Sequence, residues 1–96
     1  SNILNRIVGG SKTSQHIFGE AIDLDVDDIK GITNKDVFYW ILENLEFDQL
    51  IWEFGTANNP DWVHVSYTEK RPNRKQVLRA IRKNGSVIYV TFDLTT

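Results

Sequence analysis

A chain of 96 residues is long enough for one domain with one hydrophobic core and too short for two. Its hydrophobic (41%) and charged (25%) fractions are ordinary for a globular protein, and a net charge of −2 gives no electrostatic basis for binding nucleic acid or an anionic membrane. The absence of cysteine excludes disulfides, thiolate zinc ligands and cysteine nucleophiles, and no apolar segment approaches membrane-spanning length.

The first third of the chain predicts a helix, a loop and a strand. Residues 1–8 carry apolar side chains at helical spacing and predict the last turns of a helix. Residues 11–20 predict a polar loop that is long enough to belong to an active site. Residues 21–26 alternate as in a β-strand, so Asp23 and Asp25 share one face. Carboxylates on a strand face are costly to bury unless they are paired or bind a metal ion, which makes this face a candidate site.

The remainder predicts one helix and four strands. Thr33 to Asp36 has the spacing of a capping box, and the apolar stripe that follows predicts a helix. The strands are predicted over residues 49–54, 62–67, 77–82 and 86–92. Asn84-Gly85 between the last two favours a hairpin with a type I′ turn. This order indicates an α+β domain with an antiparallel sheet and helices packed on one side.

The two histidines, His16 and His64, together with Asp23, are candidate metal ligands. Imidazole nitrogen and carboxylate oxygen both bind zinc, and three protein ligands with an open fourth position are typical of a catalytic zinc site. A structural interpretation stands beside this one: such residues in a small domain are usually unrelated, and His64 also suits a hydrogen-bonded, half-buried strand position. The spacing alone leaves both interpretations open.

Two segments together resemble a known family. Residues 14–23 read S-x-H-x-x-G-x-A-x-D and residues 62–66 read W-V-H-V-S. This two-part motif resembles the zinc D-alanyl-D-alanine carboxypeptidase family, which groups carboxypeptidases, dipeptidases and phage endolysins on the Hedgehog/DD-peptidase fold. The segment 4–11 also looks like the family's approach to its first ligand, so the resemblance covers residues 2–66.

The resemblance implies a set of site residues. The zinc ligands are His16, Asp23 and His64. The family's general base lies three residues before the last histidine, which is the position of Asp61 here. Glu53 is a rival, because it ends the preceding predicted strand and antiparallel pairing would bring it beside the strand of His64. Both candidates stay open at this point.

The implied function is zinc-dependent hydrolysis of peptidoglycan stem peptides, by a D-Ala-D-Ala carboxypeptidase or an endolysin-type endopeptidase. Ser14, which matches a family serine near the substrate, and Trp62 are the expected substrate contacts. The alternative is a non-catalytic zinc-binding module of the same fold that binds the cell wall.

Relatives also carry an arginine upstream of Asn5 that holds the substrate carboxylate, and this sequence has no arginine at the matching place. We therefore expect residues 1–96 to be a single zinc peptidase-like domain that lacks a short N-terminal part of the family fold. We expect it to act on the bacterial cell wall as a monomer, without nucleic acid and without a membrane span.

Overall fold

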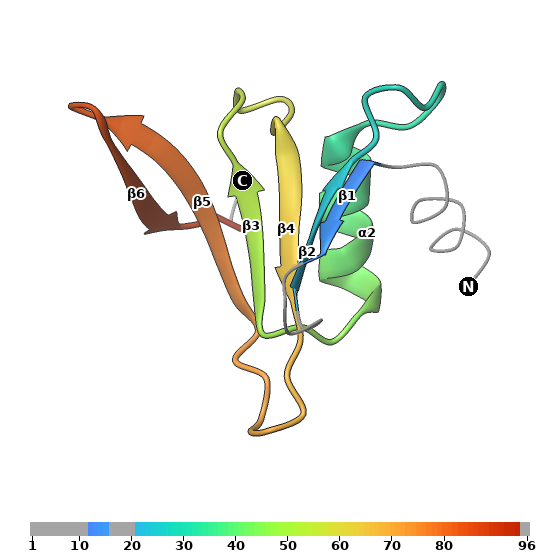
Figure 1. Cartoon of the computed structure of the whole chain (residues 1–96), viewed down its shortest axis with the longest axis vertical. Coiled ribbons are helices and arrows are strands. Elements are labelled where there is room, and N and C mark those ends of the chain that lie inside the picture. The colour runs from blue at the N-terminus through green and yellow to red at the C-terminus, as the bar shows by residue number, and fades with distance from the viewer. Residues whose placement is uncertain (1–11, 16–20, 95–96) are drawn as a thin grey trace.

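The computed structural model describes the backbone of residues 12–15 and all of residues 21–94. Within these ranges, six strands form one sheet and one helix packs on one face of it (Figure 1). The strands are β1 (Lys12–Gln15), β2 (Ala21–Asp25), β3 (Gln49–Glu53), β4 (Trp62–Ser66), β5 (Gln76–Lys83) and β6 (Ser86–Thr91), and the helix is α2 (Asn34–Asn44). The strand order across the sheet is β1-β2-β4-β3-β5-β6. The predicted α+β class is confirmed.

The helix α2 begins where the capping box predicted it. The Thr33 hydroxyl accepts a hydrogen bond from the Asp36 N–H at 3.1 Å, and the Asp36 carboxylate accepts one from the Thr33 N–H at 3.0 Å. These bonds satisfy backbone donors that have no partner within the first turn of a helix. The local sequence therefore determines where α2 starts.

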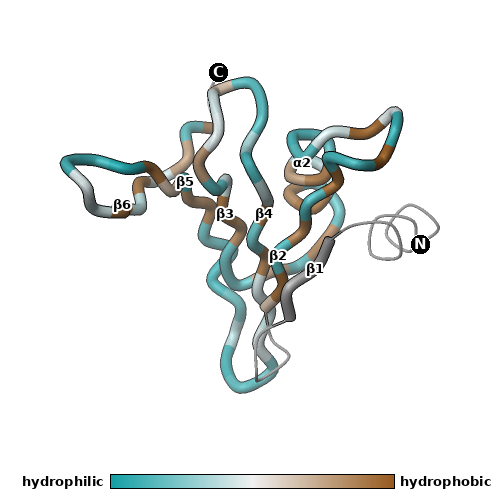
Figure 2. The backbone as a smooth tube through the Cα atoms, turned by 45° about the horizontal axis from the view of Figure 1, so that its top comes forward, coloured by the Kyte–Doolittle hydropathy of each residue, from teal (hydrophilic) through white to brown (hydrophobic). Residues whose placement is uncertain are grey.

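The hydrophobic core lies between α2 and the sheet. Phe38 of α2 packs edge-on against Trp52 of β3, with 5.2 Å between ring centroids, and tilts against Phe92 at 4.8 Å. Leu24 of β2 and Val63 of β4 are buried in the same cluster. Figure 2 shows hydrophobic segments along α2, β2 and β3, whereas the loop from β4 to β5 is hydrophilic. Among the described residues, no helix covers the opposite face of the sheet, and this open face carries the candidate site.

The prediction of an antiparallel sheet is wrong for one pair of strands. β3 and β5 are parallel, with Ile51 opposite Leu78, while the other neighbouring strands are antiparallel. The sheet is therefore mixed. The cause lies in the segment between β4 and β5: instead of making a tight turn, it crosses the end of β3, so β5 pairs with the far edge of β3.

Asp48 holds this crossing segment in place. Its carboxylate, which is buried, accepts two hydrogen bonds from the Arg71 guanidinium and three from Arg74, one of these from the Arg74 main chain. Its main chain bonds to both flanking strands, because Asp48 N–H donates to Ser66 O and Gln76 N–H donates to Asp48 O. The two arginines hold the pKa of the Asp48 carboxyl well below its usual range.

Three further predictions concern local elements. The hairpin between β5 and β6 is confirmed, and both Asn84 (φ 51°) and Gly85 (φ 80°) have the positive φ that a type I′ turn requires. The loop predicted over 11–20 is wrong for residues 12–15, which form β1; these polar residues lack apolar alternation and are ordered by backbone pairing with β2. The helix predicted over residues 1–8 lies outside the described residues. Of the helices in the described part of the chain, none is long and apolar enough to cross a membrane.

Candidate active site

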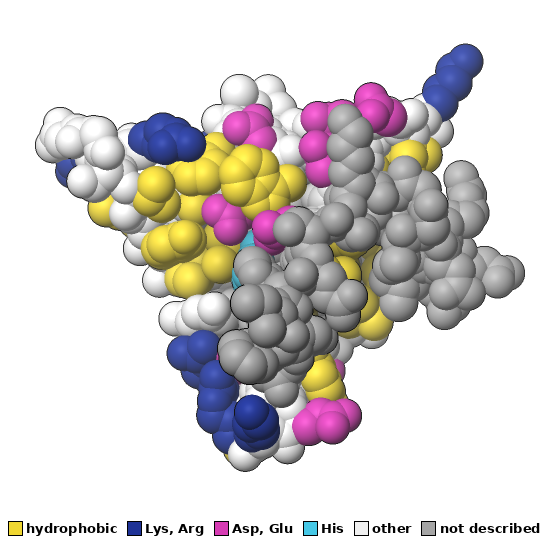
Figure 3. All heavy atoms as spheres, viewed as in Figure 1, with side chains coloured by type: hydrophobic (Ala, Val, Ile, Leu, Met, Phe, Trp, Pro, Cys, Tyr) yellow, Lys and Arg dark blue, Asp and Glu magenta, His cyan; other side chains and the backbone are white. Residues whose placement is uncertain are grey.

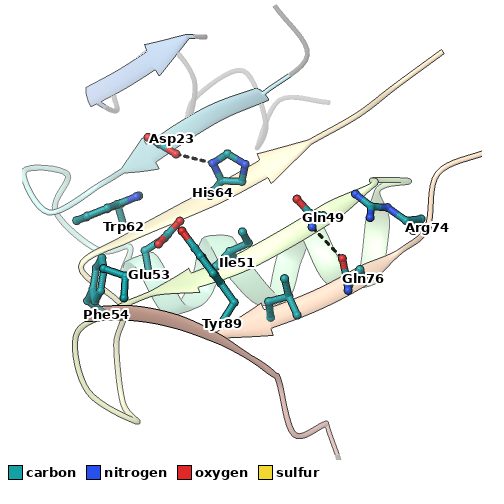
Figure 4. Close-up of a pocket in the computed structure, with 12 residues that line it drawn as sticks. Asp23, Gln49, Ile51, Glu53, Phe54, Trp62, His64, Arg74, Gln76 and Tyr89 are labelled. Atoms are coloured by element: carbon teal, nitrogen blue, oxygen red, sulfur yellow. Dashed lines mark hydrogen bonds and ion pairs between the residues drawn. The ribbon is translucent and has the colours of Figure 1, made fainter. Parts of the chain in front are cut away.

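Asp23 and His64 lie side by side on the open face of the sheet. The β2–β4 register places Asp23 opposite His64, and Nδ1 of His64 lies 2.8 Å from Oδ1 of Asp23 (Figure 4). Because an ionised carboxylate only accepts hydrogen bonds, the imidazole donates from Nδ1. The side chains of His64 and Asp23 are 18% and 29% exposed, so the pair is accessible to a ligand. This contact is compatible with His64 as a metal ligand and with His64 as a hydrogen-bonded strand residue, so the surrounding residues decide between the two.

The pair lies in an open groove of about 800 Å³. Figure 3 shows this face, where hydrophobic side chains over β5 and β6 adjoin acidic side chains and the histidine. On the rim, the ring of Trp62 packs against Phe54 at 5.5 Å, and the guanidinium of Arg82 lies 4.5 Å above the Phe54 ring. A concave site with apolar walls and a few convergent polar groups is typical of a ligand-binding pocket.

Glu53 provides a third polar group on the same face. It ends β3 directly opposite Trp62, lines the groove and is 7% exposed. Burial, together with the nearby negative charge of Asp23, raises the pKa of Glu53 to about 7. A carboxylate with a pKa near neutrality is suited to accept and return a proton at physiological pH.

Asp61, the other candidate base, lies elsewhere. Its main chain is fixed, because Asp61 N–H donates to Glu53 O at 2.9 Å and Asp61 O accepts from Asn34 Nδ2 at 2.9 Å. Its side chain is exposed and is not among those lining the groove. Burial and the neighbouring Asp25 raise the pKa of Asp27, beyond the end of β2, and the negative charge of Asp61 adds to this rise. Of the two predicted bases, the structure brings only Glu53 to the groove.

Asn34 is a structural residue of the site region that the sequence analysis missed. It is fully buried at the start of α2, where Oδ1 accepts from Val26 N–H at 2.7 Å and Nδ2 donates to the carbonyls of Pro60 and Asp61. These bonds join the end of β2 to the start of β4, the two strands that carry Asp23 and His64. The sequence signal was weak, because Asn34 looks like an ordinary residue inside the capping box.

The other predicted site residues are placed only in part. The backbone of Ser14 lies opposite Asp23 in the β1–β2 register, so Ser14, Asp23 and His64 occupy one row across three strands. Trp62 lines the groove beside Glu53. His16 follows the end of β1 and lies outside the described residues.

The Asp23–His64 pair fits a zinc site in its spacing and its donor types. Two ligands of one tetrahedral zinc ion, with bonds of about 2.0–2.1 Å, lie roughly 3.3 Å apart. The 2.8 Å between Nδ1 and Oδ1 is a hydrogen-bond distance, about 0.5 Å shorter than that separation, so the two atoms would move slightly apart to share an ion. No cluster of three or more histidine, cysteine, aspartate or glutamate side chains that could hold an ion is found within the part of the chain that the structure describes.

Comparison with known proteins gives one match. A family model described as Peptidase M15 matches residues 1–66, the part of the chain that contains Asp23, Glu53 and His64. No curated protein and no solved structure matches the chain. The matched range ends with β4, so β5 and β6 lie beyond it.

Proposed function

The chain belongs to the peptidase M15 family, and from that premise we propose that it is a zinc-dependent peptidase that hydrolyses stem peptides of peptidoglycan. The observation that supports this most strongly is the Asp23–His64 pair, 2.8 Å apart in an open groove beside the buried carboxylate of Glu53. Polar side chains are ordinary on a solvated sheet face, but a carboxylate that is only 7% exposed is costly to bury, and its position beside this pair favours a site over a scaffold role.

The metal would be held by His16, Asp23 and His64. Asp23 and His64 have donor atoms that suit zinc and lie close enough together to share one ion. Ser14, two residues before His16, pairs with the strand of Asp23. When bound, zinc supplies Lewis acidity for polarising a peptide carbonyl. Zinc would bind the neutral imidazole of His64 and the carboxylate of Asp23, so protonation of such ligands at acid pH would lower zinc affinity.

Glu53 is the proposed general base. It shares the groove with the pair, whereas the Asp61 carboxylate does not line it. In this role Glu53 takes a proton from the attacking water and returns it to the departing amine. The support is positional: Glu53 lies opposite Trp62, on the face that also carries His64.

The proposed substrate contacts are Trp62 and Ser14, on either side of the pair. The same chemistry serves a D-Ala-D-Ala carboxypeptidase and an endopeptidase, and the two differ only in which bond of the stem peptide lies over Glu53. The products therefore identify the enzyme.

The test is hydrolysis of a synthetic pentapeptide stem and of intact peptidoglycan by the zinc-loaded chain, followed by mass spectrometry of the products. We expect release of D-alanine from a carboxypeptidase, or of internal fragments from an endopeptidase, and loss of either after chelation with recovery on adding zinc. A chain that binds zinc and cleaves neither substrate contradicts the proposal and indicates a cell-wall binding module. A chain that binds no zinc indicates a structural domain.

A further inference from the structure

The β5–β6 hairpin provides one wall of the groove. Leu78 of β5 and Val87 and Tyr89 of β6 all line it. These residues lie beyond residues 1–66, the range matched by the family model, so the match says nothing about this wall. Val87 and Tyr89 are 42% and 56% exposed. Single exposed apolar side chains are ordinary, but these two lie with Leu78 along one wall of the groove, and a grouped apolar surface of this kind is typical of a binding site.

The strand register places this wall directly beside the proposed base. Glu53 lies opposite Ala80, and Ala80 lies opposite Tyr89, so the three residues form one row across β3, β5 and β6. Ala80 is buried and small, and it leaves room on the open face between the larger side chains of Glu53 and Tyr89. Figure 4 shows Tyr89 extending from β6 toward Glu53.

The row continues on the other side of Glu53 to Trp62, which lies opposite it on β4. The carboxylate of Glu53 therefore lies between two aromatic side chains, Trp62 and Tyr89, along one line of the sheet. The hairpin is also tied to this region by the contact of Arg82 with the ring of Phe54. A segment bound over Glu53 would contact apolar surface on both flanks.

The geometry points to Leu78, Val87 and Tyr89 as a specificity subsite that binds an apolar side chain of the peptide substrate next to the cleaved bond. This inference rests on the proposed function, since it names the side chain that the same groove selects. The occupant is a peptide because the wall is continuous with the Asp23–His64 pair and Glu53 in one groove. Burying an aliphatic side chain against such a wall increases discrimination by about 10-fold or more over glycine.

The test compares kcat/KM for peptides with glycine, alanine or leucine at each residue flanking the cleaved bond. The chain offers a matched pair of substitutions on one strand. Val87→Ser removes an apolar group on the groove face, whereas Val90→Ser makes the same change on the opposite face at a similar exposure, 38% against 42%. Tyr89→Ser and Tyr89→Phe separate the ring from its hydroxyl.

We expect the wild-type chain and Val90→Ser to prefer an apolar residue over glycine at one flanking position by about 10-fold. Val87→Ser and Tyr89→Ser should lose most of this preference, measured as the ratio of kcat/KM for the apolar peptide to kcat/KM for the glycine peptide, and Tyr89→Phe should keep it. Equal preference in Val87→Ser, Tyr89→Ser and Val90→Ser overturns the subsite while the peptidase function stands.

A wild-type chain that cleaves no peptide contradicts the proposed peptidase function instead. The subsite is then tested by calorimetric binding of the same peptides: weaker binding of the apolar peptides to Val87→Ser than to Val90→Ser supports it, and equal binding overturns it.

Discussion

Glu53→Gln is expected to lower kcat for peptide hydrolysis by about 10²- to 10⁴-fold, which is the usual contribution of a general base. Glutamine keeps the shape of the side chain and cannot accept the proton of the attacking water. It also removes a carboxylate whose burial is unfavourable when charged, as its pKa of about 7 indicates, so the fold should be no less stable. Zinc content should be unchanged, because Glu53 is not a proposed ligand. The measurement is kcat for the stem peptide with zinc content determined on the same sample.

Asp61→Asn is the control for Glu53→Gln, because Asp61 is the other candidate for the general base. The carboxylate of Asp61 is exposed and does not line the groove, so its loss should change kcat by less than about 3-fold, within the small effects expected of surface substitutions. A large loss of kcat in Asp61→Asn, with Glu53→Gln close to wild type, would transfer the base role to Asp61.

Asp48→Asn is expected to lower the free energy of unfolding by about 2–3 kcal/mol. Removing one partner of a fully buried ion pair usually costs about 3–5 kcal/mol, and the expected value here is lower because Arg71 and Arg74 are half-exposed and regain water. The amide replaces a carboxylate that accepts five hydrogen bonds from the two arginines. The measurement is urea unfolding at neutral pH. Glu46→Gln, which removes an exposed carboxylate two residues earlier, should stay within about 0.5 kcal/mol of wild type.

The difference in stability between wild type and Asp48→Asn should depend on pH. The folded pKa of Asp48 lies below its unfolded value of about 3.9, so the stability it contributes is fully present above that value and is lost as the pH falls toward the folded pKa. The stability difference between wild type and Asp48→Asn should therefore shrink between about pH 4 and pH 2. A difference that stays constant over this range would show that the arginines do not act through the charge of Asp48.

The elements that local sequence determines were predicted. The capping box of Thr33 and Asp36 depends on residues three apart, and the Asn84-Gly85 turn depends on two adjacent residues, so both can be read without knowing the fold. The alternation of residues 21–26 likewise predicted the strand β2 with Asp23 on one face, and in the structure Asp23 lines the groove while its neighbour Leu24 is buried in the core.

The position of β5 could not be predicted in the same way. The pattern of residues 77–82 predicts a strand but does not say which edge it joins. That choice depends on Asp48 and the arginines 23 and 26 residues further along, and such distant bonds leave no periodic signal. The assumption that successive strands pair made the sheet antiparallel, whereas the Asp48 contacts carry the chain across β3.

The choice between Asp61 and Glu53 also needed the register. Pairing of β3 with β4 was expected, but its offset depends on the turn between them, where Phe54 and Gly55 both have positive φ and Asp61 N–H bonds to Glu53 O. That turn starts β4 at Trp62 and leaves Asp61 before the strand, where its exposed side chain does not line the groove. The proposed subsite of Leu78, Val87 and Tyr89 was missed for the same reason: only the order of strands in the sheet brings the β5–β6 hairpin beside Glu53.

The most direct test of the zinc site is the zinc content of the purified chain after metal loading and desalting, measured by elemental mass spectrometry for wild type, Asp23→Ala, His64→Ala and the exposed control Asp28→Ala. From the proposed zinc site we expect about one zinc ion per chain for wild type and Asp28→Ala, and close to none for the two site variants, with all four folded by circular dichroism. A wild-type chain without zinc, or site variants that retain it in full, would contradict the assignment of Asp23 and His64 as ligands.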